Sequence, residues 1–441
     1  MAPSSSLLPP FGVVEVAAVL APSPLPCANL SANVVIGGGG GGGNAARPVS
    51  LATERPRRVV WLVRRNVAAW TRAVQAAFPQ WAQVPPACAG KRGFFVRGED
   101  GAAVPFMPET GVHNKLACFH WLLKEAPQHL RERARRFLPE TYVSFEEFEA
   151  RTTSDDDDDD ERVKQGDDAT KGAAPEARGV DDVFFFKAAR DDNGHGVVAF
   201  RGGGANVAAL LRRHRKKRGK DKRAGRCGDD LPVGIFQRFI PRLMLWPGNP
   251  PRKFDLRVYV AGLCQNGCVQ AYVYRDAAVR VSRDAFDASQ LTSTSMMTHR
   301  SGLFPTSGPY ASSQWQAWED KVLPRVVEAC GALVDALSPK LARHAEGGLF
   351  LWGFDLAVDA RHRPYLLEIN TSPQLLYPRR SCAAWVGVIH DMLRDLLTYL
   401  VAPRLFHANE GPIQEAFKDK DKVNNSKLGR WIACDHNYSS V

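Results

Sequence analysis

LFLWGFDLAVDARHRPYLLEINTSPQLL, residues 349–376, is the stretch that decides the fold of this 441-residue chain. Phe354–Asp359 and Tyr365–Asn370 within it alternate between apolar and polar side chains, which is the period of half-buried β-strands. Ala360–Arg363 lies between the two runs and predicts a connecting loop. The stretch is therefore expected to form an antiparallel β-hairpin.

The register of this hairpin decides which side chains meet. If Asp359 lies opposite Pro364, counting back places Asp355 opposite Glu368, with Asn370 two residues further along. Two carboxylates and an amide oxygen are hard ligands, and this set suits Mg²⁺ that is held partly by nucleotide phosphates. An ordinary polar face on a half-buried hairpin is the alternative. The expected faces are Asp355, Ala357 and Asp359 on the first strand, and Leu366, Glu368 and Asn370 on the second.

Composition and charge narrow the class of protein. Apolar residues make up 44% and charged residues 24%, which is ordinary for a globular protein, and no apolar run is long enough to span a bilayer. The net charge is +11, but Arg212–Arg223 alone contributes +8, which leaves +3 for the rest. A nucleic-acid-binding protein usually spreads its basic residues over a binding face, so this distribution argues against that class. The nine scattered cysteines show no metal-ligand spacing and suit free thiols in a reducing compartment.

Strand-like runs mix with helical periodicity without regular alternation, which predicts an α+β fold. The acidic run Asp155–Glu161 and the basic run Arg212–Arg223 are expected to be solvated loops, with a targeting or docking role as the alternative. A plastid-type transit peptide stays open for the leader, which is poor in acidic residues. The expected division is a disordered leader at 1–56, a small α/β domain at 57–112, a central domain at 113–240 with acidic (155–178) and basic (212–230) insertions, a C-terminal domain at 241–402 and a polar tail at 403–441.

Four further segments carry chemistry that fits a nucleotide. Lys187 ends an apolar strand and is followed by a glycine-containing loop, where a lysine can hold a phosphate; a plain hairpin turn is the alternative. Residues 252–260, RKFDLRVYV, place Asp255, Arg257 and Tyr259 on one face beside Lys253, although a surface ion pair would give the same pattern.

The other two segments supply a second arginine and a candidate base-binding strand. Residues 271–275, AYVYR, bring Arg275 out of a strand, and two fixed guanidinium groups can stabilise the charge on a transferring phosphoryl group. Residues 234–240, GIFQRFI, form a short apolar strand that can offer backbone groups to an adenine edge.

In this order, these motifs resemble the tubulin tyrosine ligase-like family, a branch of the ATP-grasp ligases. The resemblance covers most of residues 90–400, and RKFDLRVYV with the Asp355…Glu368-x-Asn370 hairpin are its most specific parts. It implies an ATP-grasp fold for the central and C-terminal domains. Site roles follow from it: nucleotide contacts by Lys115, Lys187, Gln237, Arg238, Phe239, Ile240, Lys253 and Asp255, catalysis by Arg257, Arg275 and Glu368, and Mg²⁺ ligands Asp355, Glu368 and Asn370.

The resemblance implies a reaction in which ATP converts a glutamate carboxylate to an acylphosphate, and the amine of an added amino acid (Glu, Gly or Tyr) then displaces phosphate. The expected cofactors are ATP and Mg²⁺. The expected acceptor is an acidic protein tail, most simply that of tubulin, with no nucleic-acid or membrane partner. The enzyme is expected to be a cytoplasmic monomer, with association with microtubules or cilia left open.

Two departures from the family pattern keep a second interpretation open. Ala188 follows Lys187 where the family usually has proline, and Ser293 ends a Leu-Thr-Ser segment where the family commonly has Leu-Thr-Asn. A family member that binds tubulin or nucleotide with little or no catalysis is therefore the alternative. A third hypothesis is a ligase that acts on another acidic protein.

Overall fold

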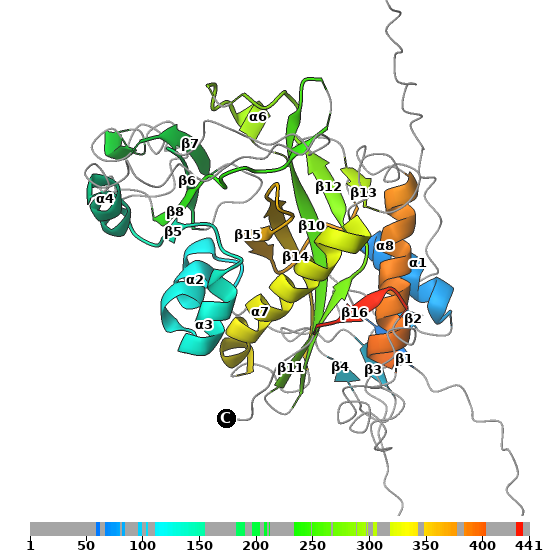
Figure 1. Ribbon diagram of the computed structural model, residues 1–441. Helices are drawn as coiled ribbons and strands as arrows, with labels where there is room; N and C mark the ends of the chain where they lie inside the picture. Colours follow the sequence, from blue (N-terminus) through cyan, green and yellow to red (C-terminus); the bar gives the residue numbers. More distant parts are fainter. Residues whose placement is uncertain are drawn as a thin grey trace, which may run out of the picture.

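The structure is a computed structural model, and the residues that it describes form three β-sheets with helices packed around them (Figure 1). Its largest sheet has β10 at the centre, and the two other sheets have four strands each. The residues that it describes are 59–61, 67–79, 82–83, 96–98, 103–104, 111–154, 182–189, 196–202, 207–209, 211, 233–247, 249–265, 268–287, 289–296, 298, 303–306, 318–342, 348–376, 383–402 and 429–434.

The large sheet is built around the long strand β10, Arg252–Gln265. One edge of β10 pairs with β12 along its first half and with β11 along its second half, and the other edge pairs with β14. The β14–β15 pair is the antiparallel hairpin that the sequence predicts. The remaining strands of the sheet are β9 (Leu245–Trp246), β11 (Cys268–Tyr274), β12 (Ala278–Val281), β13 (Leu303–Pro305), β14 (Leu349–Val358), β15 (Pro364–Asn370) and β16 (Trp431–Ala433).

A smaller antiparallel sheet contains the strand that ends near Lys187. Its order is β5-β8-β6-β7, so β8 lies between β5 and β6. Helix α4, Phe145–Ser154, covers one face, where Phe148 packs among the aromatic rings of β6, β7 and β8. The strands are β5 (Thr141–Tyr142), β6 (Val183–Ala188), β7 (Val197–Arg201) and β8 (Gly234–Arg238).

The third sheet, β2-β1-β3-β4, belongs to the segment predicted as an N-terminal α/β unit. Its strands are β1 (Val59–Trp61), β2 (Ala82–Gln83), β3 (Val96–Gly98) and β4 (Ala103–Val104), and α1 (Val67–Ala77) follows β1. Trp70 and Val74 of α1 are buried in the same core cluster as residues of α8. Helix α1 therefore packs beside α8, on the same face of the large sheet.

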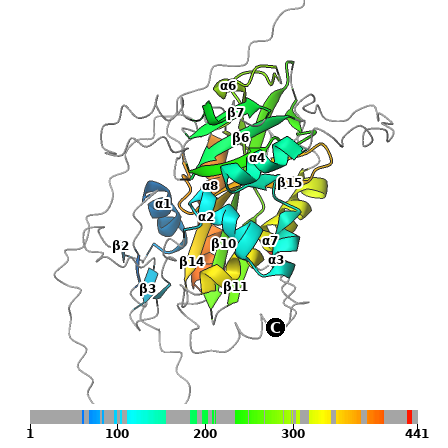
Figure 2. The same ribbon diagram turned by 90° about the vertical axis from the view of Figure 1, so that its left-hand side faces the viewer.

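Two apolar cores lie on opposite faces of the large sheet because β10 alternates. Leu256, Val258 and Val260 face the core beneath helix α7, Leu323–Ala342. Tyr259 and Ala261 face the core beneath α8, Ala383–Asp395. Figure 1 shows α1 and α8 on one side of β10, and α7 with α3 on the other; in Figure 2, which views the molecule from the side of α2 and α3, α8 lies behind the strands. The other helical segments are α2 (Lys115–His120), α3 (Gln128–Arg135), α6 (Ser293–Met296) and the π-helical η3 (Trp121–Glu125), η4 (Trp318–Val322) and η5 (Leu396–Val401).

The α+β class predicted from the sequence is confirmed. The domain boundaries stay predictions. The leader at 1–56, the acidic run, the basic run and most of the polar tail lie outside the described residues, as do all five positions between Arg190 and Gly196. None of the described helices combines the length and the apolar character needed to cross a membrane.

Candidate active site

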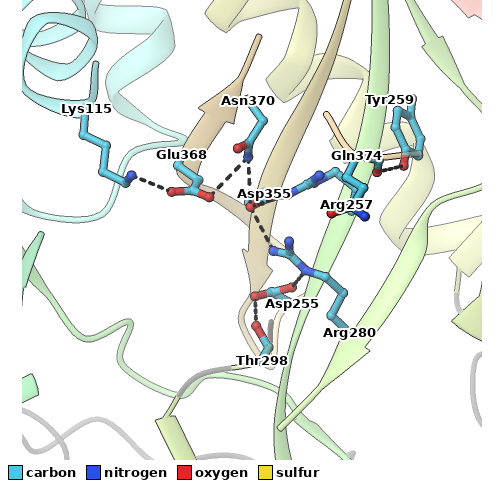
Figure 3. Close-up of polar contacts among 10 residues, drawn as sticks. All are labelled: Lys115, Asp255, Arg257, Tyr259, Arg280, Thr298, Asp355, Glu368, Asn370 and Gln374. Atoms are coloured by element: carbon cyan, nitrogen blue, oxygen red, sulfur yellow. Dashed lines mark hydrogen bonds and ion pairs between the residues drawn. The ribbon is translucent and has the colours of Figure 1, made fainter. Parts of the chain in front are cut away.

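The site forms where β10, β14 and β15 lie side by side. Arg257 pairs with Asp355 across β10 and β14, and Asp355 pairs with Glu368 across the hairpin. Asn370 lies opposite Gly353, two residues further along each strand. The predicted meeting of Asp355, Glu368 and Asn370 is therefore what the structure shows, and Figure 3 shows their side chains converging.

The register near the loop differs from the predicted one. Pro364 lies opposite Val358 rather than Asp359, and a β-bulge between Asp355 and Leu356 restores the Asp355–Glu368 pair by leaving Leu367 as the extra residue. The prediction that Leu366 shares a face with Glu368 is therefore wrong. Leu366 is buried in the core under α7, because the extra residue shifts the alternation by one position.

Asp355 is held by two arginines. Arg257 contacts this carboxylate with two guanidinium nitrogens: Nε donates to Oδ1, and a terminal nitrogen donates to Oδ2 at 3.0 Å. Arg280 of β12 places a second guanidinium 2.9 Å from Asp355 Oδ2. Because all three side chains are at least nine-tenths buried, the ion pairs are shielded from water and fix the position of the carboxylate.

Sequence reasoning missed Arg280. The residue lies opposite Asp255 in the β10–β12 ladder, and its Nε donates to Asp255 Oδ1. Thr298 donates its hydroxyl to the other oxygen of Asp255. One signal was present in the sequence. If residues 272–280 are taken as one alternating run, Tyr272, Tyr274, Ala278 and Arg280 share a face.

The same alternation places Arg275 on the other face. Its guanidinium is half-exposed and lies 2.7 Å from Glu319 of η4, beside the core under α7. The structure therefore does not bring Arg275 to Arg257 and the three metal-ligand candidates. A second arginine does lie beside Asp355, but it is Arg280 and not the predicted Arg275, because the odd-numbered positions of this run face α7.

Glu368 links the hairpin to the N-terminal part of the site. Lys115 of α2 lies 3.0 Å from Glu368 Oε2, and Asn370 Nδ2 donates to Oε1 at 3.2 Å. Burial by itself would raise the pKa of Glu368, but Lys115 and Lys187 outweigh it, and the pKa falls to about 2. The carboxylate is therefore ionised throughout the neutral pH range.

Two more buried lysines face this carboxylate cluster. Lys187 Nζ donates to the carbonyl of the bulged Leu367 at 3.1 Å, so the bulge also orients a predicted phosphate contact. Burial lowers the pKa of Lys187 to about 7, with Lys115 and Lys253 adding to the effect and Glu368 opposing it. Burial likewise lowers the pKa of Lys253, against the attraction of Asp255.

The inner face of the small sheet completes the site. Odd-numbered residues of β6 and β8 share this face, since Phe185 pairs with Gln237. Phe239 and Ile240 belong to an apolar cluster that also contains Ala357 of β14, so they line the side facing the hairpin. The Arg238 side chain points to the opposite face and pairs with Glu140 at the surface, which leaves only its backbone for the predicted hinge role.

The predicted Mg²⁺ ligands fit the requirements of a hard cation. Asn370 Nδ2 lies 3.2 Å from both Asp355 Oδ2 and Glu368 Oε1, so one amide bridges the two carboxylates, and turning it over would present its oxygen instead. Among the described residues, no three His, Cys, Asp or Glu side chains gather closely enough to hold a metal. A cation here would therefore need phosphate or water oxygens beside these three residues.

A model of the tubulin-tyrosine ligase family matches residues 112–302 and 311–409, which is well over half of the chain and includes every site residue above. The chain belongs to the tubulin-tyrosine ligase family. Among curated relatives, the probable tubulin polyglutamylases TTLL9 of Mus musculus and Rattus norvegicus are each 28% identical over 165 residues, covering 33% of this chain and 35% of theirs. The probable tubulin polyglutamylase TTLL2 of Homo sapiens is 26% identical over 181 residues, covering 36% of this chain and 29% of the relative. The matched part thus spans about a third of the length of these family members.

Proposed function

We propose that this chain is an ATP- and Mg²⁺-dependent ligase that joins an amino acid to a glutamate carboxylate of an acidic protein tail. The proposed acceptor is tubulin and the proposed amino acid is glutamate, since the curated relatives are named as probable tubulin polyglutamylases. Glycine and tyrosine are the alternatives. The proposal rests on family membership and on the charge of the site.

The site contains more positive than negative charge. When all groups are ionised, five cationic side chains face three carboxylates, an excess of two positive charges. This excess complements a nucleoside triphosphate with one divalent cation, whose net charge is about −2. The cations are Lys115, Lys187, Lys253, Arg257 and Arg280, and the carboxylates are Asp255, Asp355 and Glu368.

The proposed nucleotide lies between the small sheet and the hairpin. Lys187 and Lys253 neutralise phosphate oxygens as buried point charges, and both are poised for this because burial disfavours their charged forms until an anion arrives. Gln237 and the backbone of 238–240 hold the adenine edge, while Phe239 and Ile240 supply apolar surface to the ring.

The proposed chemistry requires positioning and charge stabilisation rather than a protein nucleophile. An oxygen of the acceptor carboxylate attacks the γ-phosphorus as the bond to ADP breaks, and the incoming amine then displaces phosphate to form the amide. Arg257 and Arg280 have guanidinium groups fixed by buried carboxylates, so little reorganisation is needed to stabilise charge on the transferring group. Mg²⁺, held by Asp355, Glu368 and Asn370, would neutralise charge between the phosphates.

The decisive experiment incubates the purified full chain with ATP, Mg²⁺, tubulin and single amino acids, and reads the products by intact mass. We expect ATP-dependent mass increments of one or more glutamyl residues. Asp182→Asn serves as the matched control, because Asp182 forms an exposed ion pair with Arg201 on the small sheet. No increment with Glu, Gly or Tyr, together with unchanged tubulin binding by Asp355→Ala, would favour the non-catalytic binding protein.

A further inference from the structure

The side chain of Gln237 has one amide atom without a hydrogen-bond partner, although only 2% of the residue is exposed. Its Nε2 donates to the hydroxyl of Thr141 at 3.1 Å, and its Oε1 has no partner among the described residues. A buried acceptor without a donor is unfavourable, so the site favours a ligand that supplies one.

Thr141 determines which amide atom is left over. The residue lies directly opposite Gln237 in the β5–β8 ladder, and its hydroxyl donates to the carbonyl of Pro139 at 2.7 Å. A hydroxyl has one proton, so Thr141 can only accept from Gln237. If the amide turned over, Gln237 Oε1 would face Thr141 Oγ1 without a proton between them. The hydrogen bonds from Gln237 to Thr141 and from Thr141 to Pro139 therefore fix the orientation of the Gln237 amide, with Oε1 as the atom left without a partner among the described residues.

A fixed acceptor discriminates between nucleobases. Gln237 lies between Thr141 and Phe185 on the inner face of the small sheet, on the strand that neighbours Lys187. The exocyclic amino group of adenine can donate to Oε1, whereas guanine presents a carbonyl oxygen at the corresponding position, and two acceptors would then meet. We infer that Thr141 is a positioning residue that makes the site select ATP over GTP by holding Gln237 in one orientation. This inference rests on the proposed nucleotide function.

The test compares the binding of MgATP and MgGTP to the full chain by titration calorimetry. The variants are Thr141→Val, which keeps the side-chain shape but removes the hydroxyl, and Thr141→Ser, which keeps the hydroxyl. We expect wild type and Thr141→Ser to prefer ATP. In Thr141→Val the ratio of the two dissociation constants should move toward one by about tenfold, because the Gln237 amide is then free to turn over. Thermal unfolding of each variant checks that it is folded.

A double-mutant cycle separates positioning from a general structural effect. If Thr141 acts through Gln237, Thr141→Val adds no further change in nucleotide preference in a Gln237→Leu background. An unchanged ATP preference in folded Thr141→Val overturns the inference and leaves the nucleotide site intact. Equal binding of ATP and GTP by wild type overturns it as well. Binding of neither nucleotide by wild type overturns both the inference and the proposed function.

Discussion

The charged face of the large sheet and the inner face of the small sheet differ in how completely their polar groups are paired. On the large sheet, Asp255 and Asp355 each accept hydrogen bonds from side chains on other strands or segments, so the carboxylates are fixed. On the small sheet, Lys187 bonds only to a backbone carbonyl among the contacts described, and Gln237 keeps an unpaired acceptor. The polar groups on the large sheet are preorganised by contacts within the protein. Those on the inner face of the small sheet leave hydrogen-bonding capacity for a ligand.

This contrast separates stability from ligand binding. Breaking a buried ion pair leaves an uncompensated charge in the folded protein, so substitutions on the large sheet should destabilise it. Removing a buried cation that lacks a charged partner in direct contact relieves a desolvation cost, so substitutions on the small sheet should affect binding much more than folding. The following predictions test this difference, starting with the largest expected effect.

Asp355→Asn should be the most damaging single change. It leaves the buried guanidinium groups of Arg257 and Arg280 facing a neutral amide, which typically costs about 3–5 kcal/mol of folding free energy. Denaturant unfolding measures the loss, and the exposed Asp182→Asn control should change by no more than about 1 kcal/mol. Equal stability of Asp355→Asn and wild type would show that the ion pairs do not preorganise this face.

Lys187→Met should have the opposite effect: little loss of folding stability and a large loss of MgATP affinity. The buried ammonium already has a pKa lowered to about 7, so replacing it with an apolar chain of similar length should leave the melting temperature unchanged or higher. MgATP affinity should fall by roughly a hundredfold, since a charge-assisted contact to phosphate is lost. Unfolding and nucleotide titration on the same sample give both values, and a destabilised variant with normal affinity would reverse the proposed contrast.

Arg280→Lys and Arg275→Lys form a matched pair on the two faces of one strand run. Lysine cannot reproduce the fork by which Arg280 contacts both Asp255 and Asp355, so we expect MgATP affinity or turnover to fall by about tenfold. Arg275 pairs with the half-exposed Glu319, and its replacement should change the folding free energy by less than about 0.5 kcal/mol and leave turnover unchanged. A larger loss of turnover in Arg275→Lys would restore the role that the sequence predicted for it.

The pair Arg275 and Arg280 also shows what sequence reasoning could and could not supply. Local alternation placed Asp355 and Arg257 correctly, because the period of two fixes which side chains share a face. It was not carried past Tyr274. The residues that follow continue along the first half of β10, and the same alternation places Arg280 rather than Arg275 opposite Asp255.

Non-local features were equally hidden in the sequence. The hydrophobic pattern does not reveal the bulge at Leu367. The predicted Asp355–Glu368 pair is nevertheless present, because the shift in the loop register and the extra residue of the bulge cancel. The hydrogen bond from Gln237 to Thr141 joins residues almost a hundred positions apart, and neither local sequence predicts it. Lys115, in contrast, was placed only through the family resemblance, and the structure brings it to Glu368.

Lys187 should also couple the small-sheet face to pH. Burial lowers its pKa from 10.5 to about 7, so between these values the unfolded chain binds a proton that the folded protein has released. The free energy of unfolding should therefore rise as the pH increases from about 7 toward 10.5, and Lys187→Met should remove this part of the slope. Thermal unfolding of wild type and variant across this range measures the difference.

Nucleotide binding should reverse the shift, because phosphate oxygens beside Lys187 favour its charged form. At about pH 8, MgATP binding should then take up a fraction of a proton, since most Lys187 is neutral beforehand. Calorimetric titrations in two buffers with different ionisation enthalpies give the number of protons taken up. The matched variant Lys187→Met should take up correspondingly less. Equal uptake by both proteins would place the titrating group elsewhere and would mean that Lys187 is already charged before the ligand arrives.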